Sequence, residues 1–172
     1  MAEQNENQTT PGAEEAGQRG ERLPDPVFSL EKVYIKDASY EAPGAPRAFL
    51  QSETPQIEVQ LRVEHAVLDS VQGVYEAVLT ITVTAAREGK TVFLAEIHQG
   101  GLFRIQGVSG EILNKTLEIT CPHMLLPFAR EAVSDFIGKG GFPPLLLQPV
   151  NFEALYEQKL VAQQAPAQPA QA

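Results

Sequence analysis

The sequence contains few of the residues on which redox chemistry, metal binding and membrane insertion depend. Its 172 residues include one cysteine, three histidines and no tryptophan. A single cysteine cannot form an intrachain disulfide, which favours a reducing compartment, and the histidines show no spacing typical of a zinc site. No run approaches the roughly 18 apolar residues of a membrane span, and the acidic, polar N-terminus is not a signal peptide. We therefore expect a cytoplasmic protein without a metal site.

Basic residues are also scarce. The chain has 13 lysines and arginines against 22 acidic residues, which gives a formal net charge of −9. Phosphate binding depends on lysine and arginine, so this balance argues against a nucleic-acid or anionic-membrane partner. It is compatible with a basic protein partner, although an acidic surface can also serve solubility alone.

The motifs of common active sites are missing too. The chain has no glycine-rich phosphate loop and no G-x-S-x-G nucleophile motif. An acid–base pair could be formed by Glu96 with His98 or by Asp37 with Glu41, since alternate residues of a strand share a face. General acid–base catalysis needs a cleft and a shifted pKa, however, which a wet sheet face does not supply. We expect no enzyme activity, no catalytic residue and no cofactor.

Composition divides the chain into three parts. Residues 1–26 are polar and acidic with almost nothing to bury, so we expect a disordered N-terminal extension. Residues 27–160 carry regular apolar patterns and form the folded domain. Residues 161–172 are rich in glutamine, alanine and proline, which indicates a disordered, low-complexity tail.

Four stretches alternate between apolar and polar residues, the pattern of strands with one buried and one wet face. These stretches begin at four positions: Val27, Ile57, Tyr75 and Thr91. We predict a turn at 69–73 and a charged hairpin turn at 87–90. The pair Gly100-Gly101 interrupts the fourth stretch and indicates a bulge or a sharp bend.

The first strand runs into a double-proline turn and carries two acids four residues apart. Regular alternation places Asp37, Ser39 and Glu41 on one face. The opposite face then holds three residues of the same strand: Tyr34, Ala38 and Tyr40.

After the fourth strand the apolar period becomes helical. Ser109 is a plausible N-cap, Cys121 opens a second helical run, and Pro127 should kink or restart that run. An apolar loop, Phe142–Val150, precedes a last helix that Asn151 caps. Strands first and helices afterwards predict an α+β fold with two layers: a four-stranded antiparallel sheet followed by two principal helices.

The helical stripes should cover one face of this sheet. The other face is mostly acidic, with one leucine and one histidine among its residues: Asp37, Glu41, Glu58, Glu64, Glu76, Leu94, Glu96 and His98. Pattern alone leaves open whether this face is solvated or is an interface. The apolar residues of the loop and the last helix favour a protein partner, either a second copy or an unfolded chain, with ordinary core as the alternative.

Four ordered blocks of the sequence resemble the SecB family of bacterial export chaperones. The blocks together extend the similarity over about 27–160: Val33–Pro46, Phe93–Phe103, Cys121–Glu131 and Phe142–Phe152. The resemblance implies a homotetramer built as a dimer of dimers. It also implies an ATP-independent holdase that keeps precursor proteins unfolded and delivers them to the SecA motor for Sec-dependent export. In that family SecA docks on the acidic sheet face, at positions that correspond here to Asp37, Glu41, Leu94 and Glu96.

Unfolded clients are predicted to lie in apolar grooves between the sheet, the 142–150 loop and the last helix. Because apolar contacts carry little sequence information, such binding can be promiscuous. Each candidate residue has core or the tetramer interface as its alternative: Tyr40, Leu125, Leu126, Phe128, Phe142, Leu145, Phe152, Leu155 and Tyr156.

Two alternative functions remain at this point. A SecB-like chaperone dedicated to one client, such as a toxin–antitoxin pair, would bind one stoichiometric client instead of many precursors. A hotdog-type thioesterase or dehydratase also combines an antiparallel sheet with a helix. That fold inserts its long helix between the first strands, whereas here four strands come first.

Overall fold

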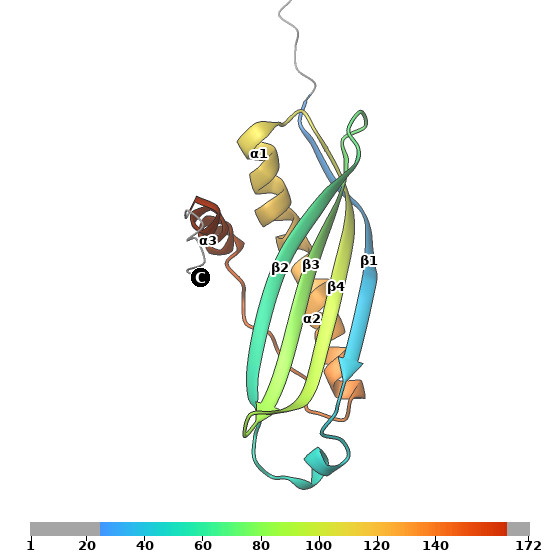
Figure 1. The fold of residues 1–172 in the computed structure, drawn as a ribbon. Coiled ribbons are helices and arrows are strands. Elements are labelled where there is room, and N and C mark those ends of the chain that lie inside the picture. Colours follow the sequence, from blue (N-terminus) through green and yellow to red (C-terminus); the bar gives the residue numbers. More distant parts are fainter. Residues whose placement is uncertain (1–24, 165–172) are drawn as a thin grey trace, which may run out of the picture.

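Four long strands form one antiparallel sheet in the order β1-β4-β3-β2 (Figure 1). The computed structural model describes residues 25–164, so most of the predicted N-terminal extension and residues 165–172 of the predicted tail lie outside the described residues. The strands are β1 (Val27–Glu41), β2 (Gln56–Asp69), β3 (Val74–Arg87) and β4 (Lys90–Gln106). The predicted α+β fold is confirmed.

The helices follow the sheet in the chain. A short 3-10 turn, η1 (Arg47–Leu50), lies between β1 and β2. After β4 come three joined helical segments: α1 (Gly110–Lys115), a π-helical turn η2 (Thr116–Thr120) and α2 (Cys121–Lys139). Figure 1 shows that they form one rod across a single face of the sheet. The last helix, α3 (Phe152–Gln164), lies beside β2 and extends beyond Leu160, where we expected the tail to begin.

The predicted restart of the helix at Pro127 is wrong, and the alternative, a kink, stays a prediction. Pro127 lies inside α2, which continues through it to Lys139. The carbonyl that loses its helical partner belongs to His123, four residues earlier. Both residues are exposed, so water can donate to that carbonyl, and packing of the opposite side of α2 on the sheet keeps the helix continuous.

The core lies between the sheet and this rod. α2 packs mainly on β4 and β3. Its buried side chains meet the inward residues of those two strands, each burial contributing about 1.5–3 kcal/mol for a large apolar side chain. The buried residues include Leu79, Ile81, Val83, Ile97, Phe103, Leu125, Val133 and Ile137.

Both predicted hairpin turns are confirmed. Between β2 and β3, Oδ1 of Asp69 accepts hydrogen bonds of 2.9 Å from the N–H groups of Val71 and Gln72. Between β3 and β4, Glu88 and Gly89 have φ values of 48° and 74°, the left-handed conformation that a two-residue hairpin turn requires.

The alternation predicted for β1 is interrupted. The pairing of β1 with β4 shifts register between Leu30 and Lys32 and again between Ile35 and Asp37. Each shift inserts one residue and exchanges the faces of the residues that follow. Val33 therefore packs against the core, and Tyr34 lies on the opposite face, contrary to our prediction.

The bulge predicted at Gly100-Gly101 is also wrong, because β4 pairs through both glycines without a shift; the alternative, a bend, stays a prediction. The glycines are needed for close packing instead. A Cβ atom on Gly100 would lie 2.6 Å from the Tyr34 ring, which covers that glycine. On the other face, a Cβ atom on Gly101 would lie 2.7 Å from Cε2 of Phe103 and 2.8 Å from Cδ2 of Leu125.

We predict that Gly101→Ala destabilises the fold by about 1–3 kcal/mol, because the new methyl group overpacks the contact between β4 and α2. The control is Gly138→Ala in α2, where a Cβ atom would meet only Cγ of Pro144 at 3.7 Å. The control should be neutral or slightly stabilising, since alanine favours the helix. Urea denaturation of both variants measures the difference, and equal effects would contradict this account of the glycine.

Candidate functional site

The sheet face turned away from α1 and α2, called here the open face, brings the four predicted SecA-contact residues together. Strand pairing arranges the part of this face around the four residues in three rows that run across β1, β4, β3 and β2. The rows are Glu41–Leu94–Thr84–Glu58, Ser39–Glu96–Thr82–Gln60 and Asp37–His98–Thr80–Arg62. Asp37 and Glu41 are exposed and Leu94 is half-buried between them and the threonines of β3. The predicted clustering of these residues on one face is therefore present in the fold.

Glu96 occupies the middle row and is held by its neighbours. Its Oε2 accepts a hydrogen bond of 2.7 Å from the Thr82 hydroxyl, and its Oε1 lies 2.8 Å from Nε2 of His98. These hydrogen bonds, that of His98 first, hold the pKa of the Glu96 carboxyl below its usual value, and the charge of Arg62 acts in the same direction. Glu96 is therefore ionised at neutral pH.

Glu76, at one end of the open face, is already paired within the chain. It accepts hydrogen bonds from the Tyr34 hydroxyl and from Nζ of Lys36, the latter at 2.7 and 2.9 Å. Burial and the Glu76 carboxylate raise the pKa of Tyr34 to about 12. The hydrogen bond from Lys36 is the largest cause that lowers the pKa of Glu76. Glu76 thus offers less free charge to a partner than Asp37 or Glu41.

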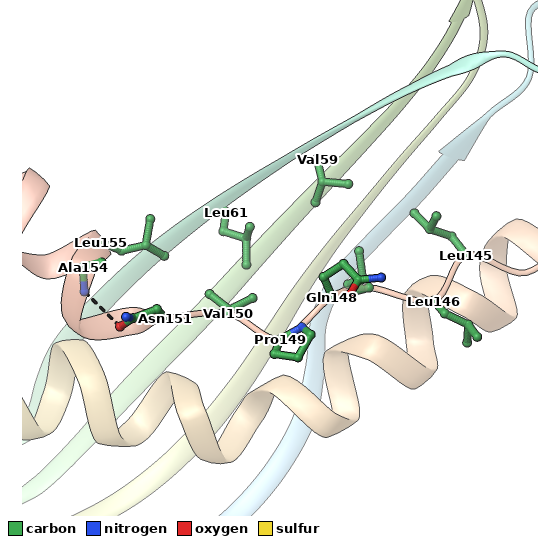
Figure 2. A pocket seen from close by; sticks show the side chains of 11 residues that line it. Val59, Leu61, Leu145, Leu146, Gln148, Pro149, Val150, Asn151, Ala154 and Leu155 are labelled. Carbon is green, nitrogen blue, oxygen red and sulfur yellow. Dashed lines mark hydrogen bonds between the residues drawn. The ribbon is translucent and has the colours of Figure 1, made fainter.

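A second candidate site is an apolar cavity of about 520 Å³ beside β2. Val59 and Leu61 of β2 form one wall, as Figure 2 shows. The irregular segment between α2 and α3, residues 140–151, is called here the strap, and its residues 145–151 form the opposite wall. Leu155 at the start of α3 closes one end. The predicted apolar loop therefore lines a cavity.

Two smaller cavities, of about 310 and 300 Å³, continue this space between β2 and α3. Leu61 and Leu155 line both the first and the second cavity, and Glu118 and Lys159 line both the second and the third. We call the three cavities together the groove.

The far end of the groove is polar and contains a buried carboxylate. Glu118 of η2 is 9% exposed, and its Oε1 lies 2.5 Å from Nζ of Lys159 in α3 and 3.3 Å from Nε2 of His65 in β2. Because a buried carboxylate needs partners, this cluster ties α3 to the body of the fold. The predicted cap of α3 is also present, since Oδ1 of Asn151 accepts from the N–H of Ala154 at 3.1 Å.

An aromatic cluster fixes the start of the strap. The Phe142 ring lies 4.8 Å from that of Phe93 and 5.1 Å from that of Phe49. Tyr40 stacks on Phe93 at 6.0 Å, and its hydroxyl donates to the carbonyl of Gly140 at 3.4 Å. Tyr40 and Phe142, two predicted client-binding residues, therefore lie together at one end of the strap.

The other predicted client-binding residues separate into three groups. Leu145, Leu155 and Tyr156 line the groove. Phe128 is 47% exposed on α2 and does not line it. The side chains of the last group are fully or almost fully covered and belong to the core, which corrects our prediction that they contact clients: Leu125, Leu126 and Phe152.

Sequence reasoning missed the wall that β2 contributes. Val59 and Leu61 have the alternation of core residues, and we assigned their face to the helical layer. α2 packs mainly on β4 and β3, and the rod reaches β2 through η2, so Val59 and Leu61 are left to the strap and α3. No local signal in the sequence indicates how far across the sheet a helix will lie.

Other chemistry finds little support among residues 25–164. No group of three acidic, histidine or cysteine residues is placed to hold a metal ion there, and no helix in that range is long and apolar enough to cross a membrane. Burial raises the pKa of the Cys121 thiol to about 12, so the thiolate is scarce at neutral pH.

Comparison with known proteins gives one consistent family. The family described as "Preprotein translocase subunit SecB" matches residues 21–164. A protein-export protein SecB from Dechloromonas aromatica is 51% identical over 149 residues, which cover 86% of this chain and 97% of that protein. A protein-export protein SecB from Halorhodospira halophila is 47% identical over 159 residues, 92% of this chain and 87% of that protein.

A solved structure shares the fold at low identity. It is a SecB-like chaperone of Mycobacterium tuberculosis in complex with a peptide from an antitoxin. It superposes with a TM-score of 0.61 and 16% sequence identity, covering 72% of this chain and 90% of that one. At this identity the likeness supports the architecture of sheet and helices alone.

Proposed function

Since the chain belongs to the SecB family and is therefore a protein-export chaperone, we propose that it is an ATP-independent holdase. It binds unfolded precursor proteins in the cytoplasm and delivers them to the SecA motor for Sec-dependent export. It acts by binding and not as an enzyme. The observation that carries this proposal is an apolar groove on one side of the sheet combined with an acidic open face on the other.

The groove suits an unfolded chain better than a small ligand. Its main cavity is lined almost wholly by apolar side chains of β2, the strap and α3, with Gln148 and Asn151 as the polar residues (Figure 2). Apolar walls bind exposed hydrophobic segments of many sequences, because they demand no specific hydrogen-bond pattern. We propose Leu145, Leu155 and Tyr156 as client contacts, with Tyr40 and Phe142 extending the apolar surface at the near end.

The open face suits a basic protein partner. Asp37 and Glu41 are exposed on β1 beside Leu94, and Glu96 is ionised in the next row. Charge complementarity of this kind gives specificity and a fast, salt-sensitive association. We propose that SecA docks here and contacts these four residues, so that client and motor use opposite sides of the sheet.

The edges of the sheet support assembly into a homotetramer, a dimer of dimers. β1 and β2 are edge strands in the single chain, and both carry exposed apolar residues. An uncovered long edge of this kind favours contact with another chain. The apolar residues in question are Val27, Phe28 and Ile35 on β1 and Ile57, Val67 and Leu68 on β2.

A chaperone dedicated to one client is the second candidate. The structural neighbour binds an antitoxin peptide, which favours this alternative, but its 16% identity is far below the 51% of an export protein. A hotdog-type enzyme is not favoured, because four strands precede the long helix here.

The holdase proposal predicts that the protein suppresses aggregation of a denatured secretory precursor without nucleotide, measured by light scattering. Leu146→Ser should raise the chaperone concentration needed for half suppression roughly twofold to tenfold, because it removes apolar surface from the groove. Leu146 lines the groove and is 80% exposed, so the fold should tolerate the change.

The matched control is Leu50→Ser. Leu50 is 88% exposed on η1 and does not line the groove. This variant should suppress aggregation as well as the unchanged chain. No suppression by the unchanged chain at a few-fold molar excess would contradict the holdase proposal, and equal activity of both variants would contradict the groove as the client site.

For the docking face, Glu96→Lys should weaken SecA binding at least roughly tenfold, because it places a like charge against a basic partner. Client binding should be nearly unchanged. SecA affinity of the unchanged chain should fall as salt is added. Isothermal titration calorimetry measures all three, and Glu131→Lys, the same charge change on the exposed surface of α2, is the control. Equal loss of SecA and client binding would indicate general damage instead.

The assembly proposal predicts a native mass of about four times the 18.7 kDa of one chain. Native mass spectrometry or light scattering of the full-length chain measures it. A monomer at micromolar concentration would count against the tetramer and against coverage of the β1 and β2 edges.

A further inference from the structure

The Glu96 carboxylate has less freedom than an acidic side chain on a wet sheet face normally has. Its two oxygens are held by two different residues on two strands: Thr82 of β3, directly opposite, at 2.7 Å, and His98 of β4, two residues along, at 2.8 Å. Asp37 and Glu41, the other acids of the proposed docking site, are exposed on the edge strand β1.

His98 is itself held in place. Its Nδ1 lies 3.2 Å from the hydroxyl of Thr80, which is its partner across β3 and is 4% exposed. A neutral imidazole with its proton on Nε2 satisfies both contacts, since Nε2–H then donates to Glu96 and Nδ1 accepts from the Thr80 hydroxyl. Thr80 and His98 form one cross-strand pair, and Thr82 and Glu96 form the next. The contact between His98 and Glu96 joins the two pairs into one hydrogen-bonded network.

We propose that Thr82 and His98 are positioning residues for partner docking: they hold the Glu96 carboxylate in its docking orientation before the partner arrives. The proposal rests on the proposed function, in which the open face docks SecA. Fixing a flexible side chain in advance removes an entropy loss that would otherwise oppose association. The expected gain is roughly threefold to tenfold in affinity for one immobilised side chain.

The electrostatics of Glu96 agree with this geometry. The same two hydrogen bonds hold the pKa of its carboxyl below the usual value. Each oxygen of a carboxylate has two lone pairs, so Glu96 can still accept hydrogen bonds from a basic group on the partner. Thr82 and His98 therefore act through Glu96 and need not touch the partner.

The test compares three threonine variants in the full-length chain by calorimetric titration with purified SecA. Thr82→Val removes the hydroxyl but keeps the β-branched shape, and we expect a threefold to tenfold rise in Kd. Thr82→Ser restores a hydroxyl and should bind as the unchanged chain does. Thr84→Val, one row away and opposite Leu94, should also leave Kd unchanged.

Two further measurements separate positioning from a general structural effect. In a Glu96→Ala background, Thr82→Val should cause no further rise in Kd, because its effect requires the carboxylate. In the free protein, the carboxyl titration of Glu96 followed by carbon-13 NMR should move to higher pH in Thr82→Val and in His98→Phe, and not in Thr84→Val.

The outcomes distinguish this inference from the proposed function. If the unchanged chain does not bind SecA, the docking proposal and this inference both fail. If it binds SecA and Thr82→Val binds equally well, or loses as much affinity in the Glu96→Ala background, the positioning role alone is overturned. An unshifted Glu96 titration in Thr82→Val would also overturn it.

Discussion

The architecture depends on one constraint: a single helical layer must cover a four-stranded sheet. The rod from α1 to α2 packs mainly on β3 and β4. One face therefore has no helix packed over it and carries many threonines and acids, while part of the inward side of β2 needs other cover. The strap and α3 supply that cover without filling the space, which leaves the groove. The open face and the groove both exist because the helical layer does not cover the whole sheet, and they lie on opposite sides of the same strands.

Much of this arrangement can be predicted from residue order, because side-chain direction in a strand has a period of two. That period places Glu96 on the open face beside Leu94 and gives the hairpin turns their positions. It also places Asp37 and Glu41 correctly, since both follow the second bulge of β1 and share one unbroken stretch of pairing. The cap at Asn151 could be predicted because the side chain and the N–H that it accepts from are neighbours in the sequence.

What could not be predicted depends on contacts between distant residues. The bulges of β1 bring Tyr34 over Gly100, a residue far along the chain, so alternation alone put Tyr34 on the wrong face. Pro127 continues its helix because the sheet holds the other side of α2. Leu125 and Leu126 were predicted to contact clients because they are apolar, but only the position of α2 over β4 shows that they are core. The wall of the groove at Val59 and Leu61 is another such case.

The order of the strands has a consequence for how the chain itself is made. β2, β3 and β4 are joined by hairpins, but β1 pairs with β4 alone, so Val27 has its partner at Gln106. During synthesis the first strand must remain without its native partner until the fourth has left the ribosome, because its pairing is long-range. For that interval the nascent chain exposes an apolar segment of the kind the finished protein binds in others. A chaperone with this topology passes through the state of its own clients each time it folds.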